Sequence, residues 1–191
     1  GKECPLPPRR DGVVPTRLPN TVLAATVDGR YRGSEFPHRG GLYGTLDGGE
    51  TWIRISGRTG DIAAIEFPNN KLRDAPVRDV VADFSGLTDK FYATVPGRRV
   101  LHRNDPSADE IFTSRGIYRS VLGGMIWQDI TGDLPAPLLN DSIRIELAVS
   151  PVGDHPVYAA IIGRNRQMTG VFRGVTGADD TVTWTQLPNV P

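Results

Sequence analysis

The sequence has little of what marks several large classes of protein. It contains a single cysteine, Cys4, so no disulfide can form within the chain. No apolar run approaches the roughly 18 residues that a membrane-spanning helix needs. Neither charge dominates, because 22 Lys and Arg balance 22 Asp and Glu. The composition therefore argues against a dedicated nucleic-acid binder, a membrane-surface protein and a membrane-spanning protein.

Recognisable catalytic and metal-binding motifs are also missing. The three histidines, His38, His102 and His155, lack the spacing of metal ligands. Neither a Gly-x-Ser-x-Gly elbow nor a phosphate-binding loop is present. We therefore expect no metal and no cofactor. Because the chain begins at Gly1 rather than at methionine, we also expect it to be a processed or excised piece.

Turn-forming residues, in contrast, are abundant. Glycine (22) and proline (16) together make about a fifth of the 191 residues. They bound short runs rich in β-branched and aromatic residues, which is typical of strands. No segment shows a sustained apolar period of 3.6 residues. The sequence therefore predicts an all-β fold.

A pattern of four short predicted strands recurs along the chain, which indicates a repeat architecture. The second to fourth strands occur three times, whereas the first copy lacks a convincing first strand, because a proline interrupts the segment 11–16 that stands in its place. At an offset of 66 residues, Val77–Phe84 aligns with Ile143–Ser150, and Phe91–Gly97 aligns with Val157–Gly163 without a gap. A shift of 68 residues brings in an earlier copy of the second strand at Leu23–Gly29. Third strands follow at Gly41–Thr45, Gly116–Ser120 and Gly170–Gly174, and fourth strands begin at Trp52, Trp127 and Trp184.

Antiparallel four-stranded units at such intervals are typical of the blades of a β-propeller. We predict about three blades, at about 20–56, 76–131 and 142–188, within a propeller segment at 20–191 that follows an extended N-terminal segment at 1–19. A β-sandwich is the alternative, but it would not require the same strand order three times. A ring typically needs four to eight blades. We therefore infer a segment of a larger propeller, or one completed by other chains.

The best-defined turn is Thr-Leu-Asp-Gly-Gly-Glu-Thr-Trp at 45–52. An Asp in such a turn can accept hydrogen bonds from the turn's own backbone, and glycine supplies the positive φ angles. The eight residues match the Asp-box pattern, Ser/Thr-x-Asp-x-Gly-x-Thr-Trp, at every defined position. The chain thereby resembles the Asp-box (BNR) repeat propellers, which include sialidases, sortilin-type receptors, xyloglucan-active glycosidases and photosystem II assembly-factor-like proteins.

The resemblance implies that the box is a folding device on the face away from the ligand site. The later copies depart from it, because Leu122 stands where the Asp belongs, Ile126 where the Thr belongs, and the third copy is stretched before Trp184. A cation site at Asp47 is the alternative, although one carboxylate does not supply the six to eight oxygens that calcium takes. The positions interpreted as structural are Thr45, Asp47, Gly49, Thr51, Trp52, Ser120, Gly124, Trp127 and Trp184.

Arginines gather in the predicted connections between second and third strands, on the rim opposite the Asp-box turn. These candidate ligand residues, the arginine rim, are Arg30, Arg32, Arg39, Arg98, Arg99, Arg103, Arg164 and Arg166. Arginine suits planar, bidentate capture of carboxylate or phosphate, so the rim is a candidate site for acidic glycans. In the alternative reading the arginines pair with nearby loop carboxylates, each pair worth under ~1 kcal/mol.

These observations favour a non-catalytic binding or scaffolding module of an extracellular or cell-envelope protein, with a glycan or a protein as partner. A second reading is part of a sialidase- or xyloglucanase-like glycoside hydrolase, which needs two carboxylates across a cleft. The sialidase Arg-Ile-Pro motif is absent, so no catalytic residue is assigned. A third reading is an assembly subunit whose open blade faces bind further blades or neighbouring chains. The carboxylates available to a hydrolase are Asp61, Glu66, Asp74, Asp105, Asp109 and Glu110.

Overall fold

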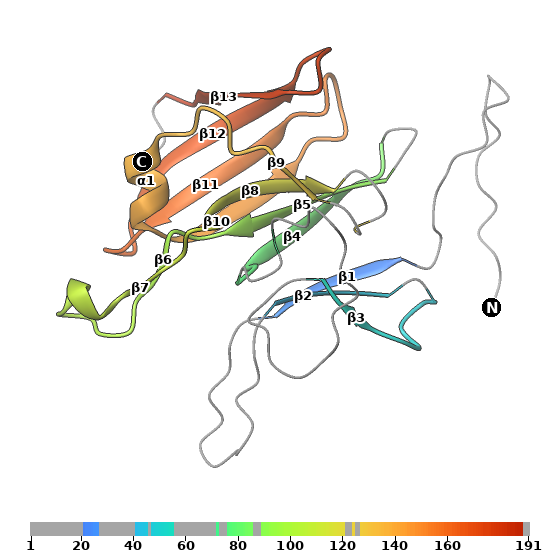
Figure 1. Ribbon diagram of the computed structural model, residues 1–191. Coiled ribbons are helices and arrows are strands. Elements are labelled where there is room, and N and C mark those ends of the chain that lie inside the picture. The colour runs from blue at the N-terminus through green and yellow to red at the C-terminus, as the bar shows by residue number, and fades with distance from the viewer. Residues whose placement is uncertain are drawn as a thin grey trace, which may run out of the picture.

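A computed structural model of the chain describes residues 21–26, 41–45, 47–55, 72, 76–85, 89–120, 124 and 127–188. In these residues the fold consists of antiparallel sheets, with one short α-helix and one 3-10 turn (Figure 1). The predicted all-β class is confirmed at this level. None of the helices in the described ranges is long and apolar enough to cross a membrane.

Three sheets each follow the order of the chain, with every strand antiparallel to its neighbours. Sheet 1 consists of β1 (Val22–Thr26), β2 (Gly41–Thr45) and β3 (Ile53–Arg54). Sheet 2 consists of β4 (Asp79–Asp83), β5 (Lys90–Val95), β8 (Gly116–Ser120) and β9 (Trp127–Asp129). Sheet 3 consists of β10 (Ser142–Val149), β11 (Val157–Gly163), β12 (Met168–Thr176) and β13 (Val182–Gln186). The expected extended segment at 1–19 lies outside the described residues.

The longest described connection joins β5 to β8. It contains β6 (Arg98–Arg99), the 3-10 turn η1 (Pro106–Ala108) and β7 (Glu110–Ile111), and β6 pairs with β7 as a separate ribbon. The helix α1 (Ala136–Asp141) precedes β10 and was not predicted. A proline in its first turn suits a helix start, but six residues are too few to display a helical apolar period.

The sheets stack face to face, with sheet 2 between the other two (Figure 1). Side chains alternate along each strand of sheet 2. Phe91 and Ala93 pack in one apolar cluster with sheet 1, whereas Tyr92 packs in a second cluster with sheet 3. We call the face of each sheet that points toward the next sheet along the chain its front, and the opposite face its back.

Strand pairing corrects the alignment of the first sheet with the second. Ala25 lies opposite Leu42, and Thr94 lies opposite Ile117, with all four side chains on the front of their sheets. Ala25 therefore corresponds to Thr94, an offset of 69 residues rather than 68. A slip of one residue would have placed every side chain of the strand on the wrong face.

The same correction applies to the first strands of sheets 2 and 3. Asp79 pairs with Thr94, and Glu146 pairs with Ala160, the residue that corresponds to Thr94. Asp79 thus corresponds to Glu146 at an offset of 67 residues, whereas the second strands keep the offset of 66. The cause is that the hairpin after β10 is one residue shorter than the hairpin after β4.

Candidate functional site

In sheets 2 and 3 the connections between second and third strands lie with α1 at one edge of the stack, opposite the turn between β12 and β13 (Figure 1). Arg98 and Arg99 lie in β6, Arg103 lies in the loop that follows, and Arg164 and Arg166 lie in the turn between β11 and β12. The remaining rim arginines, Arg30, Arg32 and Arg39, lie outside the described residues.

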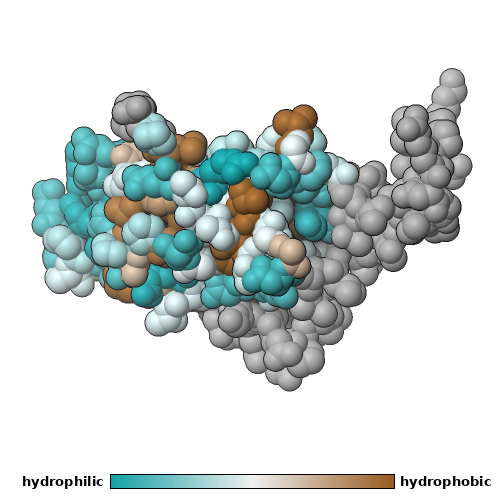
Figure 2. Space-filling model, turned by 90° about the horizontal axis from the view of Figure 1, so that it is seen from above, coloured by the Kyte–Doolittle hydropathy of each residue, from teal (hydrophilic) through white to brown (hydrophobic). Residues whose placement is uncertain are grey.

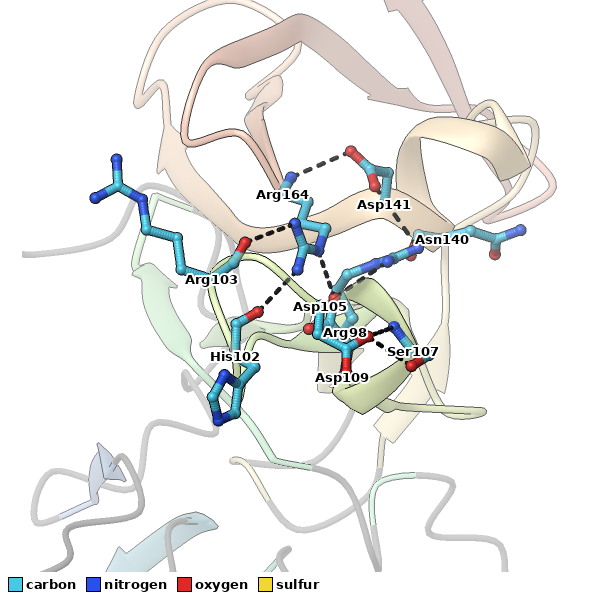
Figure 3. A network of polar contacts seen from close by, with 9 residues as sticks. All are labelled: Arg98, His102, Arg103, Asp105, Ser107, Asp109, Asn140, Asp141 and Arg164. Carbon is cyan, nitrogen blue, oxygen red and sulfur yellow. Dashed lines mark hydrogen bonds and ion pairs between the residues drawn. The ribbon is translucent and has the colours of Figure 1, made fainter.

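Asp109 is the centre of the described rim. Its side chain is 0 % exposed, and its Oδ2 accepts hydrogen bonds from Arg164 Nε at 2.7 Å and Arg98 Nη1 at 3.2 Å (Figure 3). The hydrogen bond from Arg164 lowers the pKa of Asp109 below its usual value, and Arg98 acts in the same direction against the effect of burial. Asp109 is thus an ionised anchor for two arginines.

The two arginines extend this network to three segments of the chain. Arg164 donates to the backbone carbonyl oxygens of His102 at 3.0 Å and Arg103 at 3.3 Å (Figure 3). Arg98 donates to the carbonyl of Asn140, at the end of α1, at 3.0 Å and pairs with Asp141 at 3.6 Å. Sheet 2, α1 and the β11–β12 turn of sheet 3 are therefore joined at this edge.

The remaining described rim residues divide into two groups. Arg99 forms an ion pair with Glu110 at 3.8 Å. Arg103 and Arg166 are exposed, and neither forms an ion pair with any residue in the described ranges; the guanidinium of Arg103 points away from the network in Figure 3. Only these two guanidiniums within the described rim are thus without a carboxylate partner.

Two described carboxylates of the rim, Asp105 and Asp109, are poor general acids. The Ser107 hydroxyl, donating at 2.5 Å, lowers the pKa of Asp105, as Arg164 does for Asp109. A glycosidase acid requires a carboxyl group whose pKa is raised. Asp61, Glu66 and Asp74 lie outside the described residues. Within those residues no group of three or more His, Cys, Asp or Glu is arranged to hold a metal ion.

The turn at 45–52 has the expected internal bonding. Asp47 accepts from the Thr45 hydroxyl at 2.6 Å, from the Thr51 hydroxyl at 2.5 Å and from the Thr51 backbone N–H at 2.9 Å. These bonds, led by that from Thr45, lower the pKa of Asp47 well below its ordinary value. Gly49 has φ of 106°, donates to Thr45 Oγ1 at 3.0 Å and accepts from the Trp52 indole at 3.1 Å.

The second turn repeats half of this bonding. Gly124, with φ of 86°, donates to the Ser120 hydroxyl at 2.6 Å and accepts from the Trp127 indole at 2.8 Å. These contacts correspond one by one to those of Thr45, Gly49 and Trp52. The hydroxyl–glycine–tryptophan arrangement therefore forms at a position where the sequence has no Asp.

The third turn is different from the first two. Trp184 is buried, but its indole donates to the backbone carbonyl of Ile130 in sheet 2 at 2.8 Å rather than to its own turn. Its backbone N–H donates to Asp133 at 3.1 Å. This side chain therefore joins sheet 3 to sheet 2 and makes no counterpart of the indole-to-glycine bond found in the first two turns.

The three tryptophans differ in exposure according to their place in the stack. Trp127 and Trp184 lie on the back of their sheets, against the preceding sheet, and the pairing of Gly44 with Ile53 places Trp52 at the corresponding position of sheet 1. Trp127 is 2 % exposed beneath sheet 1 and Trp184 is 6 % exposed beneath sheet 2, whereas Trp52 is 45 % exposed. The back of sheet 1 thus leaves open a position that is covered in sheets 2 and 3.

Front faces show the complementary trend. Ile117 and Ile130 on the front of sheet 2 are buried against sheet 3. Their counterparts on the front of sheet 3 are Val171 and Leu187, joined by the same backbone hydrogen bond, and both are only half-buried. Figure 2, seen from the side on which sheet 3 lies in Figure 1, shows small apolar groups among hydrophilic side chains.

Polar contacts between sheets 2 and 3 were missed by sequence reasoning. Arg119, buried on the front of sheet 2, pairs with Asp180 of the β12–β13 turn at 2.7 Å. Asp79 accepts from the backbone N–H of Leu147 at 2.8 Å, and Thr94 donates to the Ile145 carbonyl. The sequence signal that could have indicated these contacts is the arginine at 119, which lies within a predicted strand.

Burial at this interface also affects a nearby phenol. Desolvation, with a smaller effect from the charge of Asp83, raises the pKa of Tyr92 to about 12. Arg119 acts in the opposite direction. The contact between sheets 2 and 3 is therefore apolar with a few paired charges, as is usual for the interior of a protein.

No protein-family model, no curated protein and no solved structure matches the chain.

Proposed function

We propose that the chain is a non-catalytic binding or scaffolding module, built as a segment of an Asp-box β-propeller in an extracellular or cell-envelope protein. Its contact surfaces are the two open sheet faces at the ends of the stack. A protein partner therefore suits it better than a glycan.

The observation that carries this proposal is the exposure of residues whose counterparts are buried. Trp52 on the back of sheet 1 is 45 % exposed, against 2 % for Trp127. Val171 and Leu187 on the front of sheet 3 are half-buried where Ile117 and Ile130 are covered. Each of these residues stands at a place that is covered within the stack, so the two end faces are where a further unit would dock.

The blade interpretation is supported by strand order and by the turns. Sheets 2 and 3 are both four-stranded meanders, and consecutive sheets stack face to face. The hydroxyl–glycine–tryptophan bonding recurs in the turns that follow β2 and β8. Four-stranded sheets repeated in this way are typical of propeller blades, and the recurring turn supports the reading of the sheets as repeats.

Acidic glycans remain a second candidate ligand class because of two residues. Arg103 and Arg166 are exposed and have no ion pair with a described residue, whereas Arg98, Arg99 and Arg164 are already paired with carboxylates. With the other three neutralised, only two guanidiniums of the described rim are left for the bidentate capture of an anion. The rim therefore supports the glycan reading less well than the open faces support protein binding.

The test compares the wild-type chain with Arg103→Ala/Arg166→Ala and with Asp105→Asn/Glu110→Gln. Each protein is assayed for binding to a sulfated polysaccharide and to an array of sialylated glycans, and for hydrolysis of fluorogenic glycosides. We expect no hydrolysis by any of the three, and no glycan binding that distinguishes the arginine variant from the wild type. Binding lost in the arginine variant, or hydrolysis lost in the carboxylate variant, would overturn the proposal.

A further inference from the structure

We propose that the partner of the two open faces is a second copy of this chain, docked with the back of its sheet 1 on the front of sheet 3. This inference rests on the proposed function and names the partner that it leaves open. In such a contact the stack of sheets continues from one molecule into the next.

The front of sheet 3 repeats the residue types by which sheet 2 holds sheet 3. Tyr92 and Arg119 on the front of sheet 2 correspond to Tyr158 and Arg173 on the front of sheet 3, and each tyrosine lies directly opposite its arginine. On the first strand, Asp79 of sheet 2 likewise corresponds to another acidic residue, Glu146 of sheet 3. The face that is open at the end of the stack therefore has the same pattern as a face that is covered within it.

One charged pair, compared with the corresponding place between sheets 1 and 2, gives the rule that we extend to the second copy. Arg119 finds its carboxylate, Asp180, in the third-to-fourth turn of the next sheet. Sheet 1 has Gly44 at the position of Arg119, and the turn of the next sheet, at 121–126, contains no acidic residue. An arginine on a front thus goes with an acidic residue in the following turn, and a glycine with none.

Arg173 is the front arginine of sheet 3, and its ion pair among the described residues is peripheral. It contacts Asp154 at 3.0 Å, and the two side chains are 35 % and 57 % exposed, whereas Arg119 is 2 % exposed. The third-to-fourth turn of sheet 1 supplies the acidic residue that the rule requires. Asp47 is fully used by Thr45 and Thr51, so the available carboxylate is that of the exposed Glu50.

The back of sheet 1 supplies the apolar half of the contact. Trp52 stands at the place of Trp127 and Trp184, both of which are buried against the front of a preceding sheet. Half-buried Val171 and Leu187 form the corresponding apolar surface on the front of sheet 3. Burying Trp52 there would remove a large apolar area from water, which is the main driving force of association.

The test is a charge exchange followed by sedimentation velocity over a wide range of protein concentration. The wild-type chain should associate, and Arg173→Glu and Glu50→Arg should each weaken association at least about tenfold. Mixing the two variants should restore association. The negative charge placed on the front of sheet 3 by Arg173→Glu then meets the positive charge placed on the sheet 1 turn by Glu50→Arg in the other molecule. The matched control is Arg103→Glu. It reverses a charge on the rim, outside the two contact faces, so this variant should associate like the wild type.

Trp52 gives a second readout, since Trp127 and Trp184 are buried in the single molecule. Acrylamide quenching of tryptophan emission should decrease on association of the wild type and stay constant in Trp52→Phe. A wild-type chain that remains monomeric, or association that ignores both charge reversals, overturns the second copy as partner. Either result leaves the proposed non-catalytic function to be decided by the glycan and hydrolysis assays.

Discussion

At the scale of single residues, comparison of the first two turns shows which hydrogen bonds form without an Asp and which depend on Asp47. Ser120, Gly124 and Trp127 form the same hydroxyl-to-glycine and indole-to-carbonyl bonds as Thr45, Gly49 and Trp52. Their turn has no Asp at the corresponding place. Asp47 therefore reinforces a turn whose backbone path is determined by glycine and tryptophan.

This reinforcement should depend on pH. In the folded chain the hydrogen bonds from Thr45 and Thr51 lower the pKa of Asp47 below its ordinary value of 3.8. The unfolded chain therefore takes up a proton first as the pH falls, so the stabilisation by Asp47 is complete above about pH 4 and is lost below it. We expect the difference in Tm between wild type and Asp47→Ala to be present at neutral pH and to shrink progressively below about pH 4.

Thermal unfolding followed by circular dichroism at a series of pH values measures that difference. A constant gap in Tm between the two proteins down to strongly acidic pH would contradict the assignment. Comparing the two chains at each pH cancels the titration of the other carboxylates, which both proteins share.

Sequence reasoning at this scale succeeded where contacts are local. The bonds of Thr45 to Trp52 span at most four residues, and the eight-residue pattern was sufficient to anticipate them. The bonds from Arg164 to Asp109 and from Arg119 to Asp180 span 55 and 61 residues. These pairs depend on how the sheets stack, which no local pattern contains.

At the scale of elements, the close approach of α1 to the start of the β5–β8 connection organises one edge of the stack. Gly97 lies so close to the helix that a Cβ added to it would be 1.9 Å from the carbonyl oxygen of Leu139. Its backbone N–H donates to the Ser142 hydroxyl at 2.7 Å, which in turn donates to that carbonyl. Only a residue without a side chain fits between β5 and the helix.

Gly97→Ala should therefore destabilise the protein. The methyl group meets backbone rather than a movable side chain, so α1 or the connection has to shift. We expect a loss of about 1–3 kcal/mol in the free energy of unfolding, equivalent to several degrees in Tm for a chain of this length. Urea unfolding measures the change, and a free energy equal to that of the wild type would contradict this packing.

Element positions were predictable from strand-forming runs between turn residues, but their register was not. The second and third strands of the repeats were placed correctly from β-branched and aromatic residues flanked by glycine and proline. The alignment from sequence sets Ala25 against Ala93, whereas the strand pairing sets it against Thr94. The error of one residue arises because side chains of similar type occur on both faces of β1. Hydrogen-bond pairing, rather than composition, decides the face on which each residue lies.

At the scale of the whole molecule, stability should depend on which tryptophan is removed. Trp127→Ala deletes a side chain buried between sheets 1 and 2, for which we expect a loss of about 3–5 kcal/mol. Trp52→Ala removes the corresponding side chain at an open face and one exposed hydrogen bond, so the loss should be on the order of 1 kcal/mol. Chemical denaturation of the two variants compares them directly, and equal losses would contradict the stacking order.

The direction of the stack has a consequence for symmetry. Because the front of every sheet differs from its back, the two ends of the molecule are unlike, with Trp52 at one end and Val171 and Leu187 at the other. A contact between unlike ends cannot be isologous, so it cannot produce a closed two-fold dimer through a single shared patch. The rotation between successive copies then decides whether they close into a ring or extend as a filament.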